Sequence, residues 1–267
     1  MKGDDRFPDE NGGLIGDIRS ATGFLTRLPP RWIGVDPGAR PDFRRAARVF
    51  PVVGAAVGAV GGVVLAAAGA FGIADFVAAA LAVGATVVIA GGLHEDGLAD
   101  AADSLGGATV ERRLAIMDDS RIGTYGAVAV VLSLLIRVGA LAAIATRQGA
   151  VGAALVLVAA EAASRAAMVR LWHDLPAART GGLADVTGPP DHNAMLTALA
   201  IAVVIAAVAS IPAVGVRATA FAVVLAALAT YMAIRVTARM LGGRTGDTLG
   251  ACQQVALAAF LVGAATV

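Results

Sequence analysis

Long apolar runs alternate along this chain with short segments that hold most of its charge. Each run is close to the roughly 20 residues that an α-helix needs to cross a bilayer. We expect spans at about 49–72, 74–93, 124–146, 149–170, 194–214, 217–236 and 249–266. The pattern predicts an all-α fold: a polytopic membrane helical bundle of about seven transmembrane helices, with its active-site loops on the cytoplasmic side.

The chain divides into two parts by polarity. Residues 1–48 are polar and rich in arginine, whereas residues 49–267 contain every predicted span. We therefore expect a cytoplasmic N-terminal segment, 1–48, followed by a transmembrane catalytic domain, 49–267. Within the first part, residues 24–29 are expected to form a short interfacial helix that lies on the membrane. Residues 1–17 lack an apolar core, so no cleavable signal peptide is expected.

The arginines predict the orientation. With the N-terminus inside the cell, the outer turns hold only Arg147 and Arg217 among the basic residues. Basic residues concentrate on the cytoplasmic side of membrane proteins. We therefore expect an integral protein of the bacterial inner (cytoplasmic) membrane, with every polar motif and the active site facing the cytoplasm.

The composition narrows the class of protein. Hydrophobic residues make up 58% of the chain and charged residues 15%, against about a quarter charged in soluble domains. The net charge of +1 argues against nucleic-acid binding, which needs a one-sided basic surface. The one cysteine, Cys252, allows neither an internal disulfide nor a cysteine metal site. Gly54, Gly58 and Gly62 recur at four-residue spacing, which predicts close helix packing.

Residues 91–107 hold the densest group of acids. Asp96, Asp100 and Asp103 are spaced i, i+4, i+7, so on a helix their carboxylates fall within an arc of roughly 60°. Three anions on one stripe repel one another, and a divalent cation removes this repulsion. Mg²⁺ prefers oxygen ligands and usually bridges carboxylates and substrate phosphates. The stripe therefore predicts a site for one or two Mg²⁺ ions and phosphoryl transfer, and Gly97 leaves room for a phosphate.

His94 and Glu95 precede the stripe. A neutral His94 could accept a proton or bind a phosphate, or it could simply mark the membrane boundary. Glu95 points away from the aspartates on a regular helix, so it is not expected among the metal ligands.

The next polar segment, 111–126, suggests a short amphipathic helix followed by a loop. Asp119 is a candidate fourth carboxylate, and Arg121 is a candidate phosphate ligand through its fork of donors. The alternative is an ordinary surface ion pair between the two.

Charges within the predicted spans need partners or a polar cavity. Glu161 and Arg165 are four residues apart and can pair, although Arg165 could also face a cavity beneath the acids. Arg137 stands alone in its span, where it is structural or reaches toward the membrane surface. Residues 239–250 are rich in glycine and hydroxyls, which predicts either an anion cradle at a helix N-terminus or a tight turn.

Taken together, these segments resemble the cobalamin synthase family of adenosylcobinamide-GDP ribazoletransferases. The resemblance covers nearly the whole chain in order, at residues 24–29, 50–54, 91–103, 113–126, 164–165 and 242–251. The histidine–acid segment and the Asp-Ser-Arg segment are specific in combination. Two departures are small: Ser104 stands where the family usually has glycine, and Asp118 stands at a position that is often basic.

The resemblance implies a reaction. Adenosylcobinamide-GDP and α-ribazole, or its 5′-phosphate, would give adenosylcobalamin, or its 5′-phosphate, and GMP, with Mg²⁺ as cofactor. The implied metal ligands are Asp96, Asp100, Asp103 and Asp119, and His94 or a carboxylate would accept the hydroxyl proton. The implied substrate-binding residues are Arg27, Arg121, Arg165, Arg239, Thr245 and Asp247. The partners would be these substrates and the lipid bilayer, and a homo-oligomer is left open.

Two other classes compete with this interpretation. A membrane phosphotransferase of the CDP-alcohol type also uses aspartates at helical spacing, but the Ala-Arg pair expected after the glycine is missing near Gly97. A transporter would carry charges near the membrane midplane and mirrored halves. Here the polar groups cluster at one predicted surface, so a transporter is disfavoured.

Overall fold

The computed structural model describes residues 13–34, 42–179 and 188–266. These ranges are helical and contain no strand beyond an isolated bridge between Ala177 and Arg244, so the predicted all-α class is confirmed. The elements are α1 (Leu14–Leu25), α2 (Pro30–Ile33), α3 (Phe43–Ala46), η1 (Ala47–Val49), α4 (Phe50–Ala70), α5 (Asp75–Ala90), α6 (Leu93–Asp103), η2 (Ser104–Gly106), α7 (Val110–Met117), α8 (Thr124–Asp174), α10 (His192–Leu241) and α11 (Gly246–Ala264).

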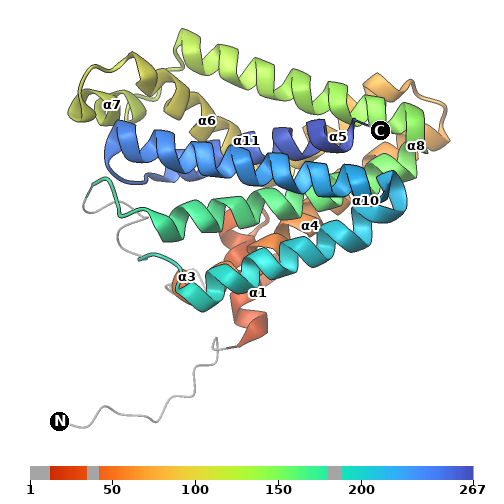
Figure 1. Cartoon of the computed structure of the whole chain (residues 1–267), viewed down its shortest axis with the longest axis horizontal. Coiled ribbons are helices and arrows are strands. Elements are labelled where there is room, and N and C mark those ends of the chain that lie inside the picture. Colours follow the sequence, from red (N-terminus) through yellow and green to blue (C-terminus); the bar gives the residue numbers. More distant parts are fainter. Residues whose placement is uncertain (1–12, 35–41, 180–187, 267) are drawn as a thin grey trace.

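The two longest elements, α8 and α10, are helical hairpins. They contain 51 and 50 residues, which would extend about 75 Å as straight helices, over twice the hydrocarbon thickness of a bilayer. Each is broken at one glycine with positive φ, Gly149 (φ 76°) and Gly215 (φ 79°). A side chain would strain the backbone there. Figure 1 shows that each element reverses direction, so that its two halves lie side by side.

The number of long apolar helices is smaller than the predicted number of spans, because α8 and α10 each contain two of the predicted spans. Four described helices are long and apolar enough to cross a membrane, or five if the bent pair of α5 and α6 with η2 counts as one span. The predicted count of about seven is therefore not confirmed. The predicted spans 124–146 and 149–170 fall within α8, and α5 has only 16 residues, about 24 Å, which is shorter than the bilayer core.

The bend between α5 and α6 separates an apolar helix from a polar one. It measures 89° and occurs at Gly91 and Gly92, both with φ 67°. α6 carries five ionisable side chains in 11 residues, too many for a segment in contact with lipid. We therefore treat α6 as lying outside the membrane-spanning helices.

The glycine stripe of α4 packs as predicted. A Cβ atom at Gly54 would collide with the backbone of Glu161, and one at Gly58 would lie 2.7 Å from the Cα of Val158. A Cβ atom at Gly62 would lie 3.1 Å from the Cβ of Ala154. The absence of side chains thus lets α4 approach the second half of α8 at backbone contact.

The N-terminal region folds differently from the expected interfacial helix at residues 24–29. α1 ends at Leu25, and the backbone N–H of Arg27 instead donates to the carbonyl of Ile89 at 2.9 Å. Two prolines follow at 29 and 30, and proline disfavours helical backbone in the residue before it. The chain is extended at Thr26, directly after α1, and then lies against the end of α5.

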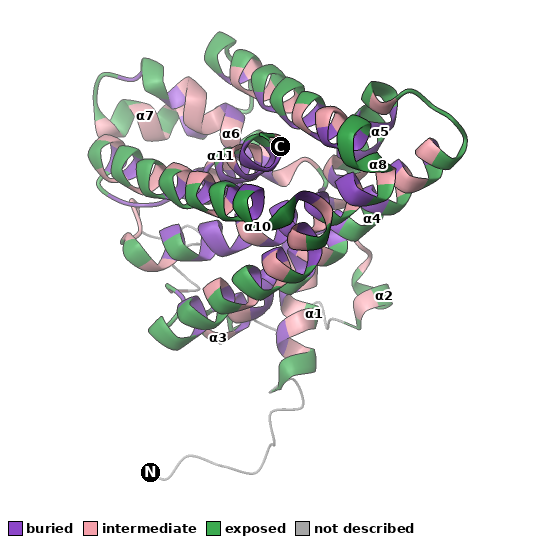
Figure 2. Ribbon diagram, turned by 45° about the vertical axis from the view of Figure 1, so that its right-hand side comes forward, coloured by how far each residue is buried: buried purple, intermediate pink, exposed green. Residues whose placement is uncertain are grey.

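The polar segments gather at one end of the bundle. Figure 1 shows α6, α7, the start of α8 and the link between α10 and α11 at its left, opposite the reversals of α8 and α10. We call this the polar end. Along the sides, α8 and α10 turn exposed apolar faces outward (Figure 2), including Val204 and Val208. This distribution fits a protein surrounded by lipid on its sides.

Candidate active site

The polar end brings the aspartates of α6 next to the first turn of α11. A Cβ atom at Gly97 would lie 2.8 Å from the carbonyl oxygen of Asp247 and 3.1 Å from its Cα. Gly250 of α11 in turn faces the backbone of His94. Gly97 is thus used for close packing of α6 on α11, and the expected opening for a phosphate beside it is wrong.

Four carboxylates lie close enough at this contact for the charges of three of them to act on the fourth. Burial and, in decreasing order, the charges of Asp96, Asp247 and Asp103 together raise the pKa of Asp100 to about 6. Repulsion of this kind is expected where like charges lie close together. We call Asp96, Asp100, Asp103 and Asp247 the acid cluster. The sequence predicted the first three as one stripe, whereas Asp247 was expected only as a substrate ligand.

Asp103 has a second role at the start of α8. Its two carboxylate oxygens accept hydrogen bonds from the backbone N–H groups of Gly123 at 2.7 Å and Gly126 at 2.9 Å. These N–H groups belong to the N-terminal turn of α8, which has no helical acceptors for them. Asp103 therefore joins α6 to α8 and fixes the boundary of the acid cluster.

No three side chains of Asp, Glu, His or Cys converge as a metal site within the described residues. Mg²⁺ is commonly bound in enzymes by one or two carboxylates together with substrate phosphates and water. The acid cluster therefore fits a cation whose coordination is completed by the substrate, and it does not resemble a closed protein cage.

Asp119 and Arg121 form a local ion pair. Arg121 donates through Nε at 3.0 Å and Nη2 at 2.7 Å to the two oxygens of Asp119, and both residues are solvent-accessible. These hydrogen bonds lower the pKa of Asp119 to about 2. The surface ion pair named as the alternative is what the structure contains, and a metal role for Asp119 stays a prediction.

His94 is buried beneath the acid cluster. It is 2% exposed, and its Nε2 has no hydrogen-bond partner within the described residues. Burial lowers the pKa of His94 well below its usual value, and the charges of Arg165 and Arg137 act in the same direction. The imidazole is therefore neutral at physiological pH. On a regular helix it points roughly 160° away from Asp96.

A polar network lies under α6 within the apolar bundle. Arg137 donates to Glu95 at 2.8 Å and to Gln254 at 2.9 Å, and Gln254 donates to Glu95 at 2.9 Å. Glu95 thus faces away from the acid stripe as predicted, and Arg137 has the structural role that was one of its two predicted alternatives. The sequence contained a signal for this network, because Gln253 and Gln254 are adjacent amides in an otherwise apolar helix.

Arg165 belongs to this buried layer. It forms the predicted ion pair with Glu161 and lies within 3.3 Å of Ser164 Oγ. At 2% exposed it is closed to a substrate, so the structure does not bring it to the acid cluster.

Other cations surround the polar end. Arg179 donates to both oxygens of Asp118 at 2.6 Å, and this contact raises the pKa of Arg179, with a smaller contribution from Asp247. Arg179 was missed by sequence analysis, because nothing local connects it to α11. Arg27 packs on Gly91 at the start of the acid segment, and Arg239 is exposed at the end of α10.

The glycine-rich link between α10 and α11 is a tight turn held by hydrogen bonds. Thr245 caps α11 and forms a reciprocal capping box with Thr248. Thr245 Oγ1 also lies 3.2 Å from an oxygen of Asp247, which orients this carboxylate. Arg244 exchanges backbone hydrogen bonds with Pro176 and Ala178. The tight-turn alternative thus describes the backbone, and phosphate binding by Thr245 and Asp247 stays a prediction.

Comparison with known proteins identifies the family to which the chain belongs. The sequence model of the cobalamin-5-phosphate synthase family matches residues 17–265. The chain belongs to this family. Adenosylcobinamide-GDP ribazoletransferases of Brucella melitensis biotype 1 and Brucella ovis are each 42% identical over 257 residues, which cover 95% of this chain and 98% of each relative. No solved structure matches the chain.

Membership of the cobalamin-5-phosphate synthase family decides between the protein classes. The chain is an enzyme, a transferase of cobalamin biosynthesis built from membrane helices. A transporter and a CDP-alcohol phosphotransferase are thereby set aside. The family match includes every member of the acid cluster and the segment around Arg27.

Proposed function

We propose that this enzyme joins α-ribazole, or its 5′-phosphate, to adenosylcobinamide-GDP. The products are adenosylcobalamin, or its 5′-phosphate, and GMP. The names of the relatives support these substrates. The observation that carries the proposal is the acid cluster at the polar end, where repulsion and burial raise the pKa of Asp100.

In this reaction a ribazole hydroxyl attacks the phosphorus next to cobinamide. A new P–O bond forms, the diphosphate bond breaks, and GMP leaves with the electron pair. Negative charge therefore builds on the leaving phosphate. The arginines of the polar end are suited to bind the phosphates through paired N–H donors. They are the exposed Arg27, Arg121 and Arg239 and the half-buried Arg179.

The donor set of the acid cluster fits Mg²⁺. Its carboxylate oxygens are the ligands that Mg²⁺ prefers, and their mutual repulsion helps to raise the pKa of Asp100. Asp96, Asp100 and Asp103 would hold the ion. Asp119 stays the weakest candidate ligand, because its carboxylate is paired with the guanidinium of Arg121. When bound, Mg²⁺ supplies positive charge that offsets the charge of the diphosphate.

The hydroxyl proton is proposed to go to a carboxylate of the acid cluster. His94 is neutral, as a base must be, but its ring is buried on the other side of α6. A general base must lie within hydrogen-bonding distance of the proton that it accepts. The geometry therefore favours Asp100 or its neighbours over His94.

The location of the site is part of the proposal. The polar end carries the arginine-rich segments, and such segments lie on the cytoplasmic side of membrane proteins. We place the enzyme in the bacterial inner membrane with the acid cluster facing the cytoplasm, where nucleotide substrates are made.

An assay of GMP release tests the proposed function. The purified full chain in detergent is mixed with adenosylcobinamide-GDP, α-ribazole 5′-phosphate and Mg²⁺. We expect GMP with the wild type and a loss of at least a hundredfold with Asp100→Asn, while Asp75→Asn, the same change at the opposite end of the bundle, stays active. No GMP with the wild type, or full activity with Asp100→Asn, would contradict the proposal.

A further inference from the structure

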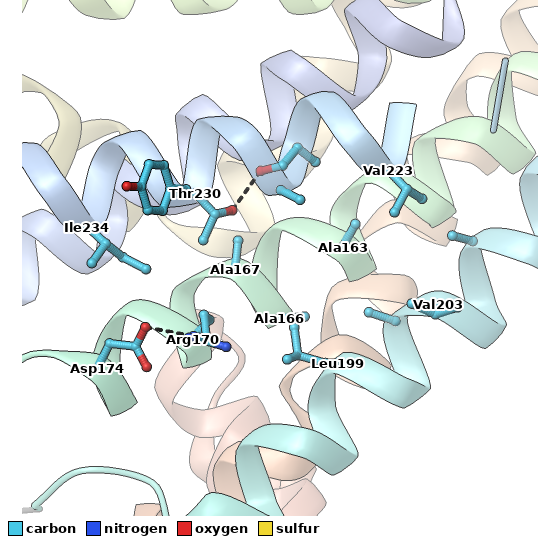
Figure 3. A pocket seen from close by; sticks show the side chains of 15 residues that line it. Ala163, Ala166, Ala167, Arg170, Asp174, Leu199, Val203, Val223, Thr230 and Ile234 are labelled. Atoms are coloured by element: carbon cyan, nitrogen blue, oxygen red, sulfur yellow. Dashed lines mark hydrogen bonds and ion pairs between the residues drawn. The ribbon is translucent and has the colours of Figure 1, made fainter. Parts of the chain in front are cut away.

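An apolar groove lies along the side of the bundle, away from the acid cluster. It has a volume of about 410 Å³ and is lined by the second half of α8 and by both halves of α10. Figure 3 shows Ala166 of α8 next to Leu199 in the first half of α10, and Ala167 pointing toward Thr230 in its second half. Ser164 and Arg165, which join the buried polar layer, are absent from its lining. The groove is therefore separate from the proposed catalytic chemistry.

The length of the groove matches one leaflet of a membrane. Ala163 and Asp174 mark its two ends on α8, and they are 11 positions apart. This corresponds to about 16 Å along the helix, and half the hydrocarbon core of a bilayer is about 15 Å. Val203 and Tyr231 on its rim are 56% and 51% exposed, so the groove opens to the surface that lipid surrounds.

The end of the groove nearest the polar end is cationic. Arg170 donates through Nε to Asp174 at 2.7 Å, which orients its guanidinium and leaves the two terminal nitrogens without a partner in the described residues. Arg235 lies over the ring of Tyr231 at 5.7 Å and donates to its hydroxyl at 3.2 Å. Within the described chain Arg235 contacts no carboxylate. Two arginines and one aspartate leave a net positive charge here.

We propose that this groove binds one acyl chain of an anionic phospholipid, whose phosphate lies on Arg170 and Arg235. A gap of this size on a lipid-facing surface is filled by apolar chains, because neither water nor empty space is favourable there. Guanidinium groups at the membrane surface bind phosphate with paired hydrogen bonds, and a tyrosine beside them is typical of the interfacial region. The ligand comes from the leaflet at the polar end.

Native mass spectrometry of the full chain in detergent tests this proposal without any substrate. The protein is titrated with phosphatidylglycerol and with phosphatidylcholine that carry the same acyl chains. We expect tighter binding of phosphatidylglycerol, and roughly 30-fold weaker binding in Arg170→Gln/Arg235→Gln, at about 1 kcal/mol for each arginine. Arg217→Gln is the matched control, because it removes an exposed arginine beside the break of α10 at Gly215, at the end of the bundle opposite the polar end.

A second variant tests the groove itself. Ala227 lines the groove and is exposed, so Ala227→Leu fills the space without disturbing the core. This variant should weaken the binding of both lipids. Equal binding of the two lipids, an equal effect of Arg217→Gln, or unchanged binding in Ala227→Leu would overturn the proposal. A dimer by light scattering that Ala227→Leu dissociates would also overturn it, because a second copy would then be the occupant. Because no turnover is measured, these outcomes are independent of the proposed reaction.

Discussion

The guanidinium of Arg137 lies 2.8 Å from the carboxylate of Glu95, and this contact ties the first half of α8 to the helix that carries the acid cluster. Arg137 is 2% exposed, and Gln254 bonds to both members of the pair. Glu95 directly precedes Asp96. The pair therefore fixes the rotation of α6 and, with it, the direction in which the aspartates face.

Removing one member of this pair should destabilise the fold. In Arg137→Met the Glu95 carboxylate stays buried without its partner, which typically costs about 3–5 kcal/mol. We expect a clearly lower Tm in detergent. The double variant Glu95→Gln/Arg137→Met should be less destabilised than Arg137→Met alone, because no unpaired charge remains. A double variant as unstable as the sum of the two single variants would contradict the coupling.

The close packing of α6 on α11 predicts a large effect of a small change. In Gly97→Ala, the new methyl group would meet the backbone of Asp247 at 2.8 Å, and such overpacking costs about 1–3 kcal/mol. Because Asp247 belongs to the acid cluster, GMP release should fall as well. Gly84→Ala is the control, since nothing lies within 4 Å of a Cβ atom there, and it should be neutral or slightly stabilising. Equal effects of the two variants would argue against the contact.

Asp103 should affect stability even without magnesium. Asp103→Ala removes the acceptor for the N–H groups of Gly123 and Gly126, and loss of a helix cap typically costs about 1–2 kcal/mol. Chemical unfolding in metal-free buffer measures this loss. Asp96→Ala is the comparison, because no such backbone contact is seen for Asp96 within the described residues. If both variants unfold alike, Asp103 does not act as a cap.

The raised pKa of Asp100 predicts how magnesium binding depends on pH. In the metal-free protein the folded state holds this proton more tightly than the unfolded state. The resulting stability is present below the unfolded pKa and is lost as the pH rises through about 6. Mg²⁺ competes with the same proton. The rise in Tm on adding Mg²⁺ should therefore be larger at about pH 7.5 than at about pH 5.

The matched control for this effect is Asp100→Asn, in which the difference between the two pH values should shrink. An equal rise in Tm at both pH values in the wild type would show that Asp100 does not compete for the ion.

Local periodicity predicted which side chains share a face of one helix, but it predicted few of the contacts between helices. The stripe of Asp96, Asp100 and Asp103 and the pair of Glu161 and Arg165 follow from helical spacing alone. The Arg137–Glu95 contact and the approach of Asp247 to Gly97 join segments far apart in the chain, and their packing has no signature in either segment. The helix expected at 24–29 failed because a backbone hydrogen bond to α5 and two prolines outweighed local apolar periodicity.

The acid cluster draws on both α6 and α11, and α11 follows every other described helix. A ribosome therefore finishes most of the bundle before Asp247 can join the other three carboxylates. During synthesis the acid cluster therefore stays incomplete until α11 packs beside α6. The order of the helices along the chain makes the cluster a late feature of folding.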